Sequence, residues 1–217
     1  MHEHLAQMEI SCCDSPQTRR GHERRLAFLL IANDLFLERG FDAVSLDDIV
    51  NHAGGSKASI YKYFGNKEGL FTAICDYRRE IFFKDICYSL ENKIGDLRSY
   101  LFQTLINFYH HIMQPCNIAF MRLVIEQTQN NPELALYLHE KGAKLIQLTV
   151  ANELAKAHEQ GKINCTDPIS SAMMYFGILR NYEWRIIMGL DISSSEQEVT
   201  KHIQYCLDRF LDGHQKV

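Results

Sequence analysis

Side chains that can bind nucleic acid crowd into one short segment of the chain: Lys57, Ser59, Tyr61, Lys62 and Tyr63. Lysine ammonium groups pair with phosphates or guanine edges, and serine and tyrosine hydroxyls reach phosphate oxygens or bases. A helix carrying them would present a surface suited to the major groove of DNA. Ordinary surface helices with buried aromatic rings have a similar composition, so the segment alone leaves both interpretations open.

The residues before this segment predict two helices that could support it. Apolar residues at helical spacing indicate a first helix from about Arg20 to Arg39, and Gly40 is a typical stop signal. Ser45 can cap a second, short helix that ends near Ala53, and Asp48 stands at the third position of a capping box.

The segment itself predicts a third helix, Lys57 to Phe64, after a tight turn at Gly54-Gly55-Ser56. Its apolar residues Ala58, Ile60 and Phe64 are expected to pack on the two helices before it. Two short helices joined by a glycine-containing turn, behind a longer helix, make a helix-turn-helix pattern.

Two runs carry a resemblance to a known family: Ala43–Ile49 (AVSLDDI) and Ala53–Leu70 (AGGSKASIYKYFGNKEGL). They closely resemble the signature of the tetracycline-repressor (TetR) family, and the resemblance extends from about Arg24 to Ile74. The family's usual pattern is a Gly-Val-Ser turn, a Tyr-x-Tyr/His-Phe core and an Asn/Ser-Lys-Glu-x-Leu opening of the fourth helix. Gly55 stands where valine is usual, which should loosen the turn slightly.

The resemblance implies a DNA-binding role for seven residues. Those on the third helix would face DNA, the capping Ser45 would touch phosphate, and Lys67 would contact the backbone from a helix N-terminus, where the helix dipole favours an anion. The predicted DNA-binding residues are Ser45, Lys57, Ser59, Tyr61, Lys62, Tyr63 and Lys67.

The rest of the chain also reads as helix after helix, and strand patterns are almost absent. We expect helices over about 67–89, 96–113, 117–129, 133–159, 168–188 and 195–211, several of them opened by Asn-Pro, Asp-Pro or Ser capping signals. The predicted fold class is all-α. The expected organisation is a disordered tail over 1–18, a three-helix DNA-binding domain over 19–66, and a ligand-binding and dimerisation domain over 67–217.

The C-terminal half resembles the family's ligand-binding half in architecture. The segments Phe120–Glu126 and Asn131–Leu134 are similar to those of multidrug-efflux-type regulators related to AcrR and AefR. The stretch from Pro168 to Met188 is apolar on more than one face, which suits a homodimer interface, although a central helix of a monomer has the same pattern.

A binding pocket for a small molecule is expected among the helices from Asp96 to Glu159, completed by the helix after Pro168. Aromatic, methionine and polar side chains there are its candidate lining, although such stripes are more often plain core. The predicted ligand-binding residues are Phe102, Tyr109, Met113, Phe120, Met121, Glu126, Tyr175 and Trp184.

Composition limits the alternatives. The formal net charge is −4, but the segment Thr18–Lys67 carries +2 and the remainder −6, which fits a DNA reader on an acidic sensor. Seven cysteines occur without zinc-type spacing, so we predict neither metal nor cofactor; a redox sensor at Cys12 and Cys13 is a minor alternative. No signal peptide or bilayer-spanning run is apparent, so we expect a cytoplasmic protein without membrane contact.

The sequence therefore predicts a dimeric transcriptional repressor that a small molecule releases from a palindromic operator in double-stranded DNA. No catalytic residues are predicted, because the chain contains no HExxH, phosphate loop or nucleophile elbow. The alternatives are a DNA-binding adaptor controlled by a protein partner and, less favoured, a helical-bundle enzyme. An enclosed pocket would favour the sensor, and a filled core the adaptor.

Overall fold

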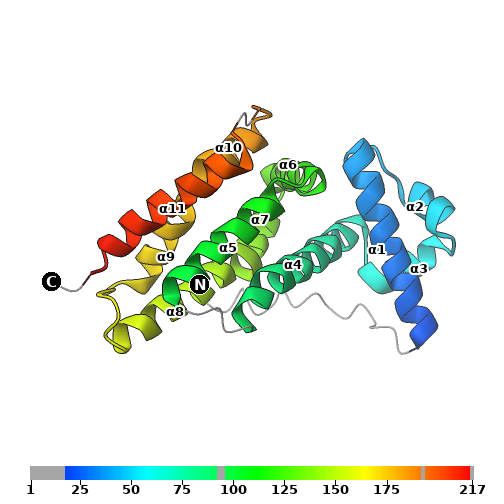
Figure 1. Cartoon of the computed structure of the whole chain (residues 1–217). Coiled ribbons are helices and arrows are strands. Elements are labelled where there is room, and N and C mark those ends of the chain that lie inside the picture. Colours follow the sequence, from blue (N-terminus) through cyan, green and yellow to red (C-terminus); the bar gives the residue numbers. More distant parts are fainter. Residues whose placement is uncertain (1–17, 92–95, 192–193, 216–217) are drawn as a thin grey trace. The chain divides into compact units, whose positions relative to one another are not determined.

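The structure is a computed structural model that describes residues 18–91, 96–191 and 194–215 (Figure 1). The predicted all-α fold is confirmed, since no strand occurs in these ranges. The predicted N-terminal tail, with Cys12 and Cys13, lies outside the described residues apart from Thr18, which caps the first helix. The chain forms two compact units, Met1–Arg78 and Arg79–Val217, which are described separately.

The first unit contains α1 (Arg19–Arg39), α2 (Leu46–Ala53), α3 (Lys57–Phe64) and the first half of α4 (Lys67–Glu91). Its core is aromatic and aliphatic: Phe28, Phe36, Ile49, Ile60 and Phe71 are each at most 1% exposed. Rings from α1, the α1–α2 loop and α4 meet at centroid distances of 5.1 to 6.1 Å. This packing holds the two short helices against α1.

Local capping signals determine where the helices of this unit begin. Ser45 and Asp48 form the predicted capping box at the start of α2, and Asn66 accepts a 2.7 Å hydrogen bond from Gly69 N at the start of α4. Gly40 ends α1 with a φ of 81° and donates its N–H to Phe36 O. The helix limits predicted for this region are confirmed to within two residues.

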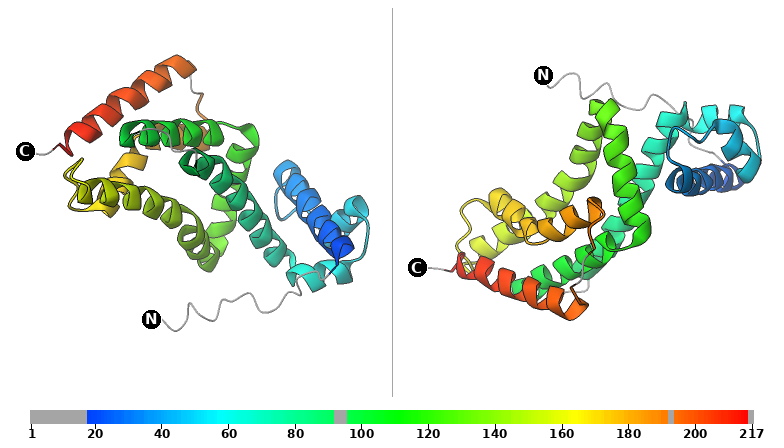
Figure 2. Two further views of the ribbon diagram at one scale, coloured as in Figure 1. Left: turned by 60° about the horizontal axis from the view of Figure 1, so that its bottom comes forward. Right: turned by 90° about the horizontal axis from the view of Figure 1, so that it is seen from above.

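The second unit is a helical bundle that continues from α4. Its elements are α5 (Leu97–Ile112), α6 (Pro115–Asn130), α7 (Pro132–Leu138), the π-helical turn η2 (His139–Ala143), α8 (Lys144–Glu159), α9 (Pro168–Gly177), α10 (Arg180–Ile187) and α11 (Glu196–Asp212). Helix α11 packs along α5, and α8 packs along α9 (Figure 2). None of the helices in the described part of the chain has the length and apolar character that a bilayer crossing requires.

Two of the predicted helices are interrupted. The stretch predicted as one helix from 133 to 159 contains the π-helical turn η2, where the chain adds a residue to a turn. The prediction of one helix from Pro168 to Met188 is wrong, because α9 ends at Gly177 and α10 begins at Arg180. At the break, Ile178 N and Leu179 N donate to carbonyls only three residues earlier, Tyr175 O and Phe176 O.

Candidate DNA-binding site

Helix α3 is anchored by its apolar side and exposes the other. Ile60 is fully buried and Phe64 is 3% exposed, whereas Tyr61 is 53% exposed and Lys62 is also exposed. Ala58 is exposed, so the expectation that it packs on the preceding helices is wrong. The exposed side of α3 is therefore a polar surface on a rigid support.

The two lysines at the ends of this region are already engaged. Lys57 Nζ lies 2.7 Å from Asp47 Oδ2, and this hydrogen bond raises the pKa of Lys57. Lys67 Nζ lies 4.3 Å from the ring centre of Phe41, and partial burial lowers the pKa of Lys67. A DNA phosphate would compete with Asp47 for Lys57. It would bind Lys67 while that ammonium group lies over the ring of Phe41.

The two predicted serines both take part in helix capping: Ser45 caps α2, and Ser59 donates its backbone N–H to the cap of α3. Ser56 caps α3, and Ser59 is half-buried with its hydroxyl 3.1 Å from that of Ser56. Tyr63 is half-buried, its ring set edge-on against Phe64 at 6.2 Å. Of the seven predicted DNA-binding residues, Tyr61 and Lys62 are the ones whose side chains form no hydrogen bond, ion pair or ring contact among the described residues.

Substituting Ser45 by alanine is expected to destabilise the first unit. Ser45 Oγ accepts a 3.1 Å hydrogen bond from Asp48 N, and Asp48 Oδ2 accepts a 2.8 Å hydrogen bond from Ser45 N. The Ser45 hydroxyl also donates to Asp48 Oδ2, and this bond together with the one from Ser45 N lowers the pKa of Asp48. Loss of such a cap costs about 1 kcal/mol, which denaturant unfolding would measure, whereas Ser45→Thr should retain most of it. A drop in DNA affinity for Ser45→Ala without any loss of stability would assign the hydroxyl to DNA instead.

The residues predicted to bind a small molecule fall into three settings. Tyr109 and Tyr175 belong to the buried core of the second unit, and Phe102 and Met113 pack against that core. Phe120 and Met121 are half-buried on α6. Glu126 on α6 and Trp184 on α10 are exposed, the latter by 59%. Their role in ligand binding stays a prediction.

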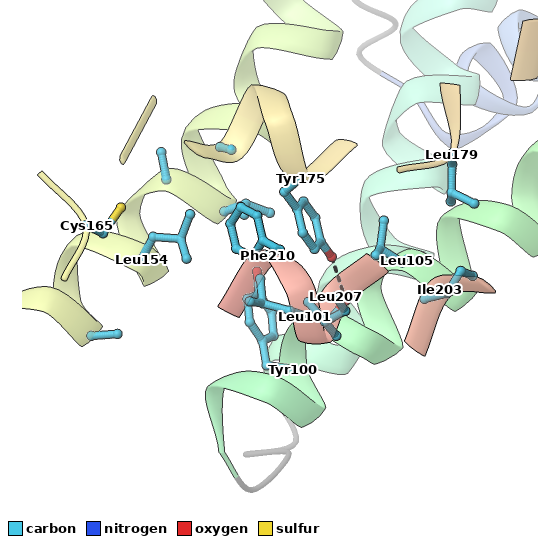
Figure 3. Close-up of a cluster of buried hydrophobic side chains, with 14 of the residues drawn as sticks. Tyr100, Leu101, Leu105, Leu154, Cys165, Tyr175, Leu179, Ile203, Leu207 and Phe210 are labelled. Atoms are coloured by element: carbon cyan, nitrogen blue, oxygen red, sulfur yellow. Dashed lines mark hydrogen bonds between the residues drawn. The ribbon is translucent and has the colours of Figure 1, made fainter. Parts of the chain in front are cut away.

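Tyr175 is the most enclosed of these side chains. It lies among Leu101, Leu105, Leu207 and Phe210, and its hydroxyl donates a 2.6 Å hydrogen bond to Leu101 O (Figure 3). Complete burial raises the pKa of Tyr175 well above its usual value, so the phenol stays neutral. Both the ring and the hydroxyl thus have a structural role in the core.

Replacing Tyr175 by phenylalanine is expected to lower the free energy of unfolding by about 1–2 kcal/mol, because it removes a buried donor from Leu101 O. Chemical denaturation of both proteins measures the difference. Tyr61→Phe is the matched control, since Tyr61 is 53% exposed on α3 and unfolding is measured without DNA. Equal stability of Tyr175→Phe and the unsubstituted protein would contradict the structural role of this hydroxyl.

A second group of aromatic side chains lies beside the core and was not predicted as a set. The rings of Phe82 on α4, Phe108 and His111 on α5 and Phe176 on α9 are half-buried. Phe82 lies 4.4 Å from His111 and 5.9 Å from Phe108, and Phe108 lies 5.8 Å from Phe176, between ring centres. We call these four side chains the aromatic cluster. No sequence spacing links them, because they come from three separate helices.

Arg122 on α6 contacts the C-terminal end of another helix. Its guanidinium donates to Ile187 O at 3.0 Å and to Ile186 O at 2.8 Å. These are carbonyls at the C-terminal end of α10, where a cation complements the helix dipole. Arg122 therefore ties α6 to the end of α10.

The last three helices expose an unusual amount of apolar side chain. Ile169 and Met173 are one turn apart on α9, and Trp184 on α10 is one turn before Met188, the residue that caps this helix. We define the C-terminal apolar surface as the following side chains, each at least half exposed: Ile169, Met173, Met174, Trp184, Met188, Leu190 and Tyr205. Large exposed apolar surfaces of this kind mark sites of association.

The described residues contain no group of three or more His, Cys, Asp or Glu side chains placed to hold a metal ion. The adjacent histidines His110 and His111 have separate contacts: His110 Nε2 lies 2.9 Å from Glu196 Oε1, and the ring of His111 lies 4.4 Å from that of Phe82, between ring centres.

Comparison with known proteins assigns the two units to one family. Residues 29–74 match the family described as bacterial regulatory proteins of the tetR family, and residues 99–215 match the C-terminal domain of AefR-like transcriptional repressors. The HTH-type transcriptional regulator YezE of Bacillus subtilis is 27% identical over 144 residues, which cover 65% of this chain and 74% of YezE.

Solved structures of regulators share the fold. A TetR-family transcriptional regulator from Mesorhizobium loti superposes with a TM-score of 0.82 at 23% identity, covering 92% of this chain and all of that one. The flavonoid-responsive regulator FrrA superposes with a TM-score of 0.76 at 26% identity, covering 89% of this chain and 98% of FrrA. The second family match alone spans more than half of the chain, and its order after the first is that of a DNA-binding domain followed by a regulatory domain. The chain therefore belongs to the TetR family of bacterial transcriptional regulators and carries an AefR-like C-terminal domain.

Proposed function

We propose that this regulator is a cytoplasmic repressor that binds a palindromic operator as a homodimer and leaves it when a small molecule binds the second unit. The observation that carries the proposal is the two-sided character of α3, whose apolar side is buried while Tyr61 and Lys62 remain exposed. Helix-turn-helix proteins place such a helix in the major groove. The AefR-like domain supports repression rather than activation.

The C-terminal apolar surface is the proposed dimer interface. Regulators of this family act as dimers, and a stable interface buries about 800 Å² on each partner. Trp184, Met173 and Met174 are each more than half exposed, and tryptophan and methionine are enriched in interface cores. A two-fold axis through this surface would pair each copy with the same residues of the other.

The aromatic cluster is the proposed site for the effector. Half-buried rings from three helices offer flat apolar faces, and His111 adds a polar group beside them. This chemistry suits a planar aromatic molecule, the class to which the flavonoids of the FrrA response belong. Phe82 lies on α4, which begins at Lys67 in the DNA-binding unit, so a ligand that moves Phe82 would act on the helix common to both units.

Enrichment of random duplex DNA by the purified protein, followed by sequencing, tests the DNA-binding half of the proposal. We expect a palindrome whose half-sites are about one helical turn apart. A folded dimer that enriches no sequence at low salt would contradict it. Once the operator is known, a flavonoid panel can be tested for release of the DNA.

The effector half is tested by thermal unfolding in the presence of the same panel. A molecule that binds only the folded protein raises the melting temperature, by an amount that grows with the logarithm of the ratio of its concentration to its Kd. Phe176→Leu should reduce this rise without preventing DNA binding, since Phe176 belongs to the aromatic cluster and not to the first unit. A rise that Phe176→Leu leaves unchanged would place the ligand elsewhere. A protein that binds its operator but responds to none of the panel would favour control by a protein partner.

A further inference from the structure

The turn between α2 and α3 leaves room for a side chain from another helix. Gly54 and Gly55 both have positive φ, 71° and 100°, which disfavours any residue with a Cβ. A Cβ on Gly55 would lie 2.6 Å from Nη1 of Arg24 and 3.0 Å from Cζ of Phe28. The space that a larger residue would take at position 55 is therefore filled by two side chains of α1.

This arrangement explains why Gly55 replaces the usual valine of the family pattern. The sequence alone suggested that the substitution loosens the turn, but the guanidinium of Arg24 packs directly over it. Nη1 of Arg24 also lies 3.8 Å from the position of a Cβ on Gly54. The two residues thus depend on each other: because Gly55 has no Cβ, the guanidinium of Arg24 can occupy the space beside it.

The charge of Arg24 is not neutralised by the contacts around it. Its neighbours on α1 are engaged, since Arg19 pairs with Glu23 at 3.0 Å and the guanidinium of Arg25 lies 5.0 Å from the ring centre of Phe64. Among the described residues, no carboxylate forms an ion pair with Arg24, and no group accepts a hydrogen bond from its guanidinium. A half-buried arginine over a helix-turn-helix turn is therefore a cation available for an external anion.

We infer that Arg24 is an additional DNA-binding residue, which contacts a backbone phosphate of the operator next to the N-terminus of α3. The inference rests on the proposed reading of DNA by α3. Helix-turn-helix proteins insert the N-terminal part of the recognition helix into the major groove, so the turn before it faces the groove edge. A guanidinium held there can bind a phosphate through two parallel hydrogen bonds.

The position favours phosphate over base. Arg24 is fixed to α1 and lies over the backbone of the turn, whereas base-reading side chains project from the exposed face of α3. A phosphate contact sets the position of the protein on the duplex and carries no sequence information itself. Arg24 should therefore strengthen binding to operator and to unrelated duplex by the same factor.

The test compares Arg24→Met with the unsubstituted protein on the enriched operator and on an unrelated duplex, across a series of salt concentrations. Methionine keeps an unbranched apolar stem and removes the charge. Because the dimer carries two copies of Arg24, we expect affinity to fall by about 25-fold on both duplexes at moderate salt, about five-fold for each subunit, and the slope of log affinity against log salt to decrease by about 1.8, about 0.9 for each phosphate. Arg24→Lys should retain the slope. Lys162→Met, which removes an exposed lysine from the second unit, is the control for net charge.

A second variant tests the pairing. Gly55→Ala places a Cβ where Nη1 of Arg24 lies, so it should reduce the salt slope although Arg24 is present. Thermal unfolding of each variant, measured in the same buffer, separates a lost contact from a partly unfolded protein.

Three results would overturn the inference. An unchanged salt slope for Arg24→Met, with normal operator binding by the unsubstituted protein, would exclude the phosphate contact. A loss confined to the operator and absent on unrelated DNA would make Arg24 a base reader. Failure of the unsubstituted protein to bind any duplex would overturn the proposed function, and the inference with it.

Discussion

Introducing glutamate at both Met173 and Trp184 is expected to convert the protein into a monomer and to weaken operator binding by at least about 100-fold. The two side chains are 57% and 59% exposed, so the substitutions should leave the folded chain intact. In a dimer that buries the C-terminal apolar surface, however, two carboxylates per chain would lose water without a partner. Each monomer would then bind one half-site independently. In the dimer, by contrast, binding of one subunit raises the effective concentration of the other subunit at the second half-site.

Sedimentation or light scattering measures the first effect, and titration of the operator measures the second. Leu136→Glu is the matched control, because Leu136 is 49% exposed on α7 and lies outside the C-terminal apolar surface. The control should remain dimeric. A doubly substituted protein that also remains dimeric would show that the interface lies on another surface, and the dimer proposed here would have to be abandoned.

Local signals were sufficient to predict most helix limits. Ser45 with Asp48, Ser195 with Glu198, and the Asn131-Pro132 and Asp167-Pro168 pairs are capping patterns whose hydrogen bonds close within three residues. Such contacts depend on the sequence nearby and little on the rest of the fold. The corresponding helices begin where the sequence predicts or within two residues of it.

The break between α9 and α10 depends on contacts from far along the chain. His202 on α11 lies with Nε2 3.4 Å from Ile178 O, and its ring stacks edge-on with Tyr182 on α10 at 5.5 Å. The sequence pattern within 168–188 does not predict these contacts with His202. Tyr175 before the break is fully buried and Trp184 after it is 59% exposed, as expected for residues nine positions apart, which lie on opposite faces even of an unbroken helix. Both had been predicted to line one pocket.

The candidate DNA-binding site shows a similar division. The sequence identified the residue types and the helix, because their spacing alone places Ile60 and Phe64 on the side opposite the exposed residues of α3. It did not distinguish engaged cations from available ones. Lys57 meets Asp47 across the turn, Lys67 lies over Phe41, and Arg24, absent from the predicted set, occupies the space above Gly55. These pairings depend on tertiary packing.

Truncating Tyr61 and Lys62 together to alanine is expected to weaken operator binding by about 2–4 kcal/mol at each half-site, which corresponds to about 30- to 1,000-fold per half-site of the palindrome, because each contact to a base or phosphate contributes about 1–2 kcal/mol. Both side chains are exposed and neither contributes to the core around Ile60 and Phe64, so the melting temperature should change little. Mobility-shift titration on the enriched operator measures the affinity, and thermal unfolding of the same samples verifies the fold.

Single substitutions divide the effect between shape and charge. Tyr61→Phe retains the ring and removes the hydroxyl, so it should change the preference at one base pair or one phosphate and leave most of the affinity. Lys62→Ala should weaken all duplexes alike if the ammonium binds phosphate, and should relax specificity at one position if it binds a guanine edge. Lys162→Ala removes a comparable exposed charge from the second unit and should bind as the unsubstituted protein does. The double variant decides whether α3 reads the DNA at all. If its operator affinity stays within two-fold of the unsubstituted value, DNA is read by a surface other than the exposed face of α3. No other two side chains on that face offer a hydroxyl and a cation that are both so exposed.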